Sequence, residues 1–153
     1  MSKDIHTWER INTLCCQLLE QLNPKDYDAI LAITRGGMIP ACLISEGLDI
    51  RNVLTAGVMF YTDVGETLHE PRFLQFPSDV LLNGKRILIV DDVWDSGKTA
   101  VAVKGRVSKA GGQPTVAVIH FKPESNNFPD ERPDFAALET DAWIVYPWED
   151  ACH

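Results

Sequence analysis

The sequence is short of basic residues and has no long apolar run. Of its 153 residues, 14 are Lys or Arg and 22 are Asp or Glu, which gives a formal net charge of −8. This charge argues against nonspecific nucleic-acid binding, because such binding depends on Lys and Arg at phosphates. No apolar run approaches the roughly 20 residues of a membrane-spanning helix. We therefore expect neither nucleic acid nor a membrane as a partner.

The sequence also lacks the cysteine spacing of a disulfide framework or a zinc site. Its cysteines are two adjacent residues and two isolated ones, Cys15, Cys16, Cys42 and Cys152. The first residues contain no apolar segment like that of a secretory signal peptide. These features favour a reducing compartment, and we expect a cytoplasmic location. The length and the 45% hydrophobic content fit a single domain over residues 1–153.

Apolar residues along the chain alternate between helical and strand-like spacing. From Ile11 to Leu22 they form the stripe of an amphipathic helix, which Thr7 can cap. This alternation predicts an α/β fold with an open, mostly parallel sheet and helices on both faces. We expect helices over 7–22, 38–47 and 97–110, and strands over 28–34, 53–61, 87–90, 115–121 and 143–146.

Residues 62–84 interrupt the alternation. The segment is polar, contains glycine and proline, and has space for a pair of strands. It is longer than an ordinary connection between elements, and segments of this kind are usually lids, binding loops or disordered stretches.

The strongest signal is the run ILIVDDVWDSGKT at residues 87–99. An apolar strand leads into Asp91 and Asp92, and a short turn then leads into a helix. Ligands of open α/β sheets bind at the carboxyl ends of the strands. Two adjacent carboxylates near a core are costly unless a cation or hydroxyl groups meet them, and Mg²⁺ with a sugar diol suits both. The turn offers backbone N–H groups, hydroxyls and a helix N-terminus, which suit a phosphate.

Gly97, Lys98 and Thr99 also match the end of a Walker A loop. That motif requires a glycine five residues before Gly97. The residue there is Asp92, so the sequence excludes a P-loop nucleotide-binding site.

The run at residues 87–99 resembles, at every position, the phosphoribosyl-pyrophosphate-binding signature of the type I phosphoribosyltransferases. The resemblance implies that Asp91 and Asp92 bind the ribose and Mg²⁺, directly or through water. It also implies a pyrophosphate-binding loop at Thr34–Gly37, whose Thr34–Arg35 peptide bond we expect to be cis, and a hood at residues 62–84. The implied 5′-phosphate ligands are Asp95, Ser96, Gly97, Lys98 and Thr99, and the implied pyrophosphate ligands are Arg35, Gly36 and Gly37.

The residues expected around the base resemble those of the xanthine-guanine branch of this family. Asp95 occupies the position at which 6-oxopurine enzymes carry aspartate, and the resemblance gives it an acid/base role at N7 of the purine. Lys122 would donate to the exocyclic O6, and Trp143 would stack on the base. Ile144 would contribute backbone contacts, and Glu149 would lie near the 2-substituent. The branch often has an acidic residue in place of Val145 and glycine in place of Lys98.

Some of these side chains also have simpler interpretations. Lys122 could be solvated, and Trp143 could be a core aromatic; for Trp148, packing is the favoured interpretation. Trp94 fills an apolar position of the signature, which favours packing or a hood contact. We interpret all four histidines as non-catalytic because none has ligand or catalytic spacing, namely His6, His69, His120 and His153.

The resemblance implies a purine salvage enzyme that joins guanine, xanthine or hypoxanthine to phosphoribosyl pyrophosphate with Mg²⁺. The products would be a nucleoside 5′-monophosphate and pyrophosphate, and the expected assembly is a homodimer or homotetramer. Two alternatives stay open. One is a non-catalytic regulator on the same fold, which senses phosphoribosyl pyrophosphate or a nucleotide. The other is an enzyme for another acceptor, such as adenine or a pyrimidine.

Overall fold

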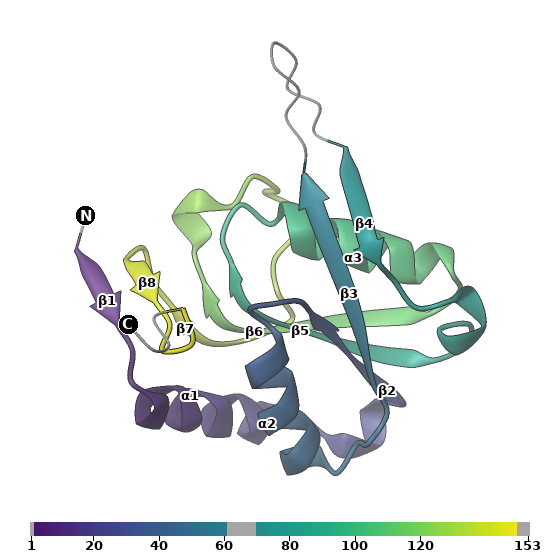
Figure 1. The fold of residues 1–153 in the computed structure, drawn as a ribbon, viewed down its shortest axis with the longest axis horizontal. Helices are drawn as coiled ribbons and strands as arrows, with labels where there is room; N and C mark the ends of the chain where they lie inside the picture. The colour runs from purple at the N-terminus through teal and green to yellow at the C-terminus, as the bar shows by residue number, and fades with distance from the viewer. Residues whose placement is uncertain (1, 61–69, 150–153) are drawn as a thin grey trace.

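A six-stranded, mostly parallel sheet forms the centre of the computed structural model, which describes residues 2–60 and 70–149. The strand order is β4-β3-β2-β5-β6-β7, and all neighbours are parallel except β3 and β4 (Figure 1). The strands are β2 (Ala29–Ile33), β3 (Val53–Phe60), β4 (Pro71–Gln75), β5 (Arg86–Trp94), β6 (Gln113–Phe121) and β7 (Phe135–Glu139). The predicted α/β class is confirmed.

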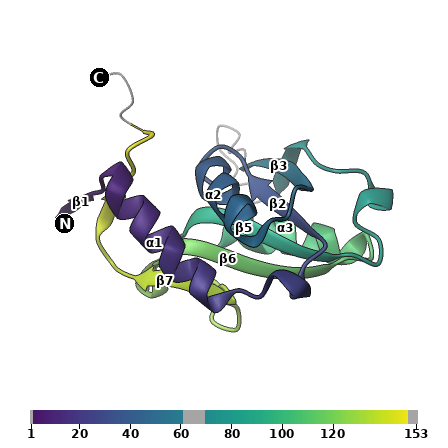
Figure 2. The same ribbon diagram turned by 90° about the horizontal axis from the view of Figure 1, so that it is seen from below.

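Helices cover both faces of the sheet, as expected. Helices α1 (Trp8–Gln21) and α2 (Met38–Leu48) lie on one face and α3 (Lys98–Lys109) on the other (Figures 1 and 2). Along β5, Ile87 and Ile89 pack with the α3 side, whereas Leu88 and Val90 pack with the side of α1 and α2. Burial on both faces is the reason that the strand is apolar throughout rather than alternating.

Capping residues and proline in the sequence predict where the helices begin. Thr7 caps α1, where its hydroxyl accepts a hydrogen bond from the Arg10 N–H at 3.0 Å. Pro40 lies in the first turn of α2, where a missing N–H costs nothing. None of the helices in residues 2–60 and 70–149 is both long and apolar enough to cross a membrane.

Strand β5 is longer than predicted. It continues past Val90 to Trp94, because Asp91 pairs with Val118 and Trp94 pairs with Phe121 of the neighbouring strand β6. The two aspartates therefore belong to the end of a strand and are held by its ladder.

The segment 62–84 contributes one strand to the sheet, β4, which runs antiparallel to β3. The short 3₁₀ helix Asp79–Leu81 follows it. Residues 62–69 of the predicted hood lie outside the described residues.

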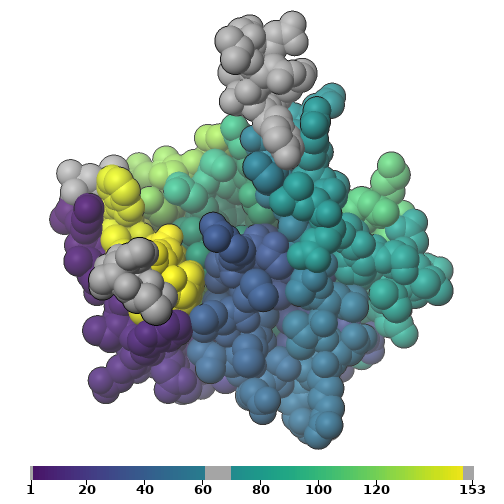
Figure 3. Space-filling view, viewed as in Figure 1, coloured from purple at the N-terminus to yellow at the C-terminus, as the bar shows by residue number. Residues whose placement is uncertain are grey.

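Two strands were not anticipated. Strand β7 is the short run Phe-Ala-Ala-Leu-Glu, whose alanine, leucine and glutamate favour a helix in isolation. Strand β1 (Lys3–Ile5) pairs in parallel with β8 (Trp143–Val145) in a separate two-stranded sheet. This pairing places a segment near the start of the described chain beside one near its end, and the two lie side by side on the surface (Figure 3).

The centre of β5 is expected to carry much of the stability. Ile89 is fully buried, so Ile89→Ala should lower the free energy of unfolding by about 2–5 kcal/mol, measured by urea denaturation. The matched control is Val80→Ala, because Val80 is 77% exposed and its truncation should change stability by less than about 0.5 kcal/mol. Similar losses in the two variants would contradict this account of the core.

Candidate active site

The candidate site lies where β2 and β5 end. The loop after β2 carries Arg35, Gly36 and Gly37, and the end of β5 carries Asp91 and Asp92. A Cβ atom on Gly36 would overlap the Asp92 carboxylate, so only glycine permits this close approach. The sheet thus brings together two groups of residues that are far apart in the sequence.

The Thr34–Arg35 peptide bond is cis, which confirms the expectation from the sequence. Arg35 is exposed beside the cleft. Gly37 lies behind the loop, where its N–H donates to the Ile33 carbonyl at 2.8 Å. Gly37 therefore holds the start of α2 against the end of β2.

Burial dominates the electrostatics of the acidic pair. It raises the pKa of Asp91 well above the usual range, and the neighbouring Asp92 charge raises it further. Burial also raises the pKa of Asp92, although hydrogen bonds such as the one from the Val93 N–H at 2.7 Å act in the opposite direction. The pair is a place where a bound cation or hydroxyl groups would relieve an existing electrostatic cost.

The turn that follows β5 has the shape of an anion cradle. Gly97 has a φ of 87°, and the Lys98 N–H donates to the Ser96 hydroxyl at 3.3 Å as α3 begins. A cleft of about 220 Å³ lies over this turn and reaches back to the acidic pair, lined in part by Asp91, Asp92, Asp95, Ser96, Gly97 and Thr99.

The residues expected around the base come together at the end of β6. The Lys122 ammonium lies 3.8 Å from an Asp95 carboxylate oxygen, and the Lys122 side chain is only 12% exposed. Trp143 is 57% exposed, so it does not pack in the core. The Ile144 side chain does pack in the core, which leaves its backbone to face the cleft. Lys122 is therefore held in place and is not a freely solvated lysine.

Glu149 and Trp148 border the same region from the end of the described chain. A Glu149 carboxylate oxygen accepts a hydrogen bond from the Tyr146 N–H at 2.8 Å. The Trp148 ring stacks on Tyr146 at 4.6 Å between centroids. This stacking agrees with the packing interpretation of Trp148, while Glu149 both closes a turn and faces the cleft.

Three clefts meet at Asp92. The first cleft, of about 640 Å³, lies between the Arg35–Gly36 loop and Trp148. The second lies over the turn that follows β5. The third, of about 200 Å³, lies between Lys122 and Trp143. A ligand that filled all three would have two anionic ends, a hydroxylated centre and a flat ring. Gly37 borders none of the three.

Comparison with known proteins agrees with this geometry. The family of the phosphoribosyl transferase domain matches residues 1–150. The chain belongs to the phosphoribosyltransferase family. A xanthine-guanine phosphoribosyltransferase of Ruegeria sp. is 37% identical over 86% of this chain and 74% of the relative.

Two solved structures extend the comparison. A purine phosphoribosyltransferase from Pyrococcus horikoshii has a TM-score of 0.85 at 33% identity, over 97% of this chain and 95% of that one. A protein from Neisseria gonorrhoeae with bound ppGpp has a TM-score of 0.84 at 28% identity, over 99% of this chain and 91% of that one. The whole described architecture is thus that of a phosphoribosyltransferase.

A buried hydrogen-bond chain behind the phosphoribosyltransferase site was not found from the sequence. The Tyr146 hydroxyl donates to the Asp92 carbonyl at 3.1 Å, and His120 Nδ1 lies 2.8 Å from the same hydroxyl. Because the hydroxyl proton is used toward Asp92, His120 Nδ1 must carry the proton of the second bond. Only the position of His120 on the inward side of β6 could have suggested this contact.

His120 and His6 are structural rather than solvent-exposed residues. Their rings lie 4.7 Å apart and both are buried. Within residues 2–60 and 70–149, neither His120 Nε2 nor His6 Nδ1 has a hydrogen-bond partner. Neither ring lines the three clefts, and the other two histidines, His69 and His153, lie outside the described residues.

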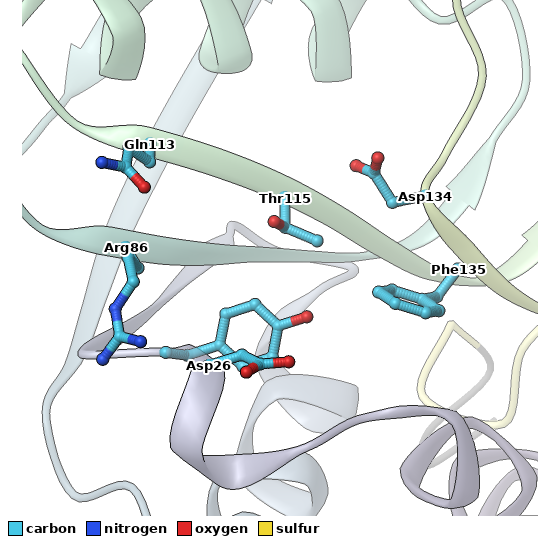
Figure 4. Close-up of a pocket in the computed structure, with 7 residues that line it drawn as sticks. Asp26, Arg86, Gln113, Thr115, Asp134 and Phe135 are labelled. Atoms are coloured by element: carbon cyan, nitrogen blue, oxygen red, sulfur yellow. The ribbon is translucent and has the colours of Figure 1, made fainter.

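Another cleft lies at the opposite, amino-terminal edge of the sheet (Figure 4). Two of its charged side chains are used in the fold. The Arg86 guanidinium binds Asp28 and the Lys25 carbonyl, and an Asp134 carboxylate oxygen accepts the Val116 N–H at 2.7 Å. These two side chains therefore stabilise the amino-terminal edge of the sheet.

The neutral His120 ring should make the protein sensitive to acid. Burial, followed by the His6 charge, lowers the pKa of His120 from 6.5 to about 4. Between these values the unfolded chain binds more protons than the folded chain, so the free energy of unfolding should fall as the pH falls through this window. The slope for one proton is at most about 1.4 kcal/mol per pH unit.

Urea unfolding at several pH values measures this slope. His120→Asn keeps a hydrogen-bonding group near Tyr146 but cannot be protonated, so its stability should depend less steeply on pH below about 6.5. Parallel pH profiles for the variant and the unaltered protein would show that His120 is not the group responsible.

Proposed function

We propose that this phosphoribosyltransferase transfers the phosphoribosyl group of phosphoribosyl pyrophosphate to N9 of a 6-oxopurine. The observation that carries the proposal is the Lys122 ammonium, which is covered and held beside Asp95 in the cleft bordered by Trp143. A fixed cation there favours a 6-oxo group, which accepts a hydrogen bond, over a 6-amino group. Relatives named for xanthine, guanine and purine activity support the same class of base.

The three clefts correspond to the parts of the donor and acceptor. Arg35 and the Gly36 backbone would hold pyrophosphate by charge-assisted hydrogen bonds. Gly37, whose N–H donates to the Ile33 carbonyl, would support this loop from behind. The turn from Asp95 to Thr99, including Ser96, Gly97 and Lys98, would bind the 5′-phosphate at the start of α3. Trp143 would stack on the base, with the Ile144 backbone and Glu149 near its 2-substituent.

Asp91 and Asp92 fit Mg²⁺ together with the ribose hydroxyls. Their burial raises both pKa values, so an adjacent cation would stabilise the charged forms. The described residues contain no cluster of three or more His, Cys, Asp or Glu side chains suited to a metal, which agrees with a cation held largely by substrate and water. When bound with the donor, Mg²⁺ would neutralise charge on the departing pyrophosphate.

Asp95 would act as acid and base in this reaction. Asp95 borders both the second cleft, over the turn that follows β5, and the third cleft, between Lys122 and Trp143. In the purine tautomer with its proton on N7, N9 has a free lone pair that can attack C1′. Asp95 would accept the N7 proton as the bond from N9 to C1′ forms and the bond from C1′ to the pyrophosphate oxygen breaks. Arg35 would stabilise the leaving charge.

Two further features are proposed from the family resemblance. Residues 62–84 would act as the hood that excludes water, with β4 anchoring part of this segment to β3. The chain would work as a single domain over residues 1–153 and assemble as a homodimer or homotetramer. The family match over residues 1–150 supports the single domain.

A regulatory role is the second candidate. The neighbour from Neisseria gonorrhoeae contains bound ppGpp, a guanine nucleotide with two pyrophosphate groups. Such a ligand has the same combination of parts that the three clefts accommodate. The candidate predicts tight nucleotide binding without turnover.

Pyrophosphate release from phosphoribosyl pyrophosphate and Mg²⁺ distinguishes the candidates. We expect release with guanine, xanthine or hypoxanthine, and none with adenine, uracil or orotate, because Lys122 favours a 6-oxopurine. Asp95→Ala should lower kcat at least about 100-fold, with a smaller effect on donor affinity.

The control is Asp28→Ala. Asp28 is an exposed aspartate paired with Arg86 at 3.0 Å, much as Asp95 is paired with Lys122, but it lies outside the clefts and outside the proposed hood. An unchanged kcat in Asp95→Ala would remove its assigned role. Nucleotide binding without release from any base would favour the regulatory candidate.

A further inference from the structure

The loop after β6 contains an asparagine whose hydrogen-bonding capacity is fully used. Asn126 Oδ1 accepts from the Trp94 indole Nε1–H at 3.0 Å and from the Phe128 N–H at 3.1 Å. Its Nδ2 donates to the Phe128 carbonyl at 3.0 Å and to the Glu131 carbonyl at 2.8 Å. The opposite amide orientation would set donors against donors, so the network fixes the orientation of the side chain.

One of these bonds reaches the strand that carries the site. Trp94 is 1% exposed, packs edge-on against Phe121, and immediately precedes Asp95. The Trp94 indole N–H donates its hydrogen bond to the Asn126 side chain. The indole N–H therefore joins the end of β5 to the loop after β6.

Backbone bonds reinforce the same connection. The Asn127 N–H donates to the Ser96 carbonyl at 2.9 Å, and the Lys122 N–H donates to the Trp94 carbonyl at 2.9 Å. The far side of the loop is tied to α3, since the Lys104 ammonium lies 3.3 Å from a Glu131 carboxylate oxygen. The loop is thus attached both to the turn and to the helix that follows the turn.

The Trp94–Asn126 bond lies directly beneath Gly97. A Cβ atom on Gly97 would lie 2.5 Å from Trp94 Nε1 and 3.0 Å from Asn126 Oδ1. The turn is therefore packed against the hydrogen bond itself. A movement of Asn126 would therefore disturb the packing beneath Gly97, which has a φ of 87°.

We propose that Asn126 is a positioning residue for the 5′-phosphate turn. Through Trp94 and the adjacent Ser96 contact, it holds the turn in its binding geometry before ligand arrives. The fold then bears the entropic cost of ordering the turn, so less of the binding energy of the phosphate is lost when it binds. This inference rests on the proposed function, which assigns the 5′-phosphate to residues 95–99.

The test compares guanosine 5′-monophosphate with guanosine by isothermal titration calorimetry. The Kd of guanosine divided by the Kd of guanosine 5′-monophosphate is the ratio that isolates the contribution of the 5′-phosphate. In Asn126→Ala, we expect this ratio to fall at least about 10-fold, while the Kd of guanosine changes less than about twofold. A general loss of structure would instead weaken both ligands together.

The matched control is Asn23→Ala. Asn23 also closes a local turn, accepting the Lys25 N–H at 3.0 Å, but it lies at the amino-terminal edge of the sheet. Its ratio should equal that of the unaltered protein. Thermal unfolding of each variant establishes that the protein measured is folded.

Trp94→Phe removes the same hydrogen bond from the other partner and serves as the second variant. Its ratio should also fall, and the double variant should lose no more than the larger single loss, because both changes break one bond. An unchanged ratio in folded Asn126→Ala, equal weakening of both ligands, or additive losses would overturn the inference. If the unaltered protein itself gains nothing from the 5′-phosphate, the proposed function fails and the inference fails with it.

Discussion

The structure depends on two carboxylates that a central strand forces into a low-dielectric position. Asp91 and Asp92 lie at the end of β5, and the ladder to β6 keeps them there. Water cannot fully solvate them, so their charged forms are costly until a ligand supplies a cation and hydroxyl groups. The neighbouring loop accommodates this arrangement by using glycine at position 36. Relief of this desolvation cost by a bound cation and hydroxyl groups would contribute to the binding energy of a substrate.

The parts of the molecule with strong local signals could be predicted from the sequence. The buried strands are apolar runs, α1 has both a stripe and a cap, and the signature at residues 87–99 predicted a strand that leads through a turn into a helix. These features are local because each depends on spacing within a few residues. The cis peptide bond at Thr34–Arg35 and the family were predicted from resemblance, and both are confirmed. The roles of the individual site residues stay predictions.

The parts that were missed depend on contacts between distant segments. Strands β1 and β7 have little strand character of their own. Strand β7 forms at the open edge of the sheet beside β6, and β1 forms by pairing with β8 in a separate two-stranded sheet. The bond from Tyr146 to Asp92 and the bond from Asn126 to Trp94 each join residues that no periodic pattern relates. Asn126 looked like an ordinary loop residue, and only its surroundings show that all its polar capacity is used.

The pairing of β1 with β8 has a consequence for the order in which the site is completed during synthesis. Strands β2 and β5 find their neighbours within the sheet once β6 has emerged. The first strand must wait for β8, near the end of the described chain, before it can pair, which is a slow, long-range closure. A nascent chain can therefore complete the centre of the sheet, with the residues proposed to bind the donor, before Trp143 on β8 is in place. In the proposed function, the acceptor site would be completed after the donor site during synthesis.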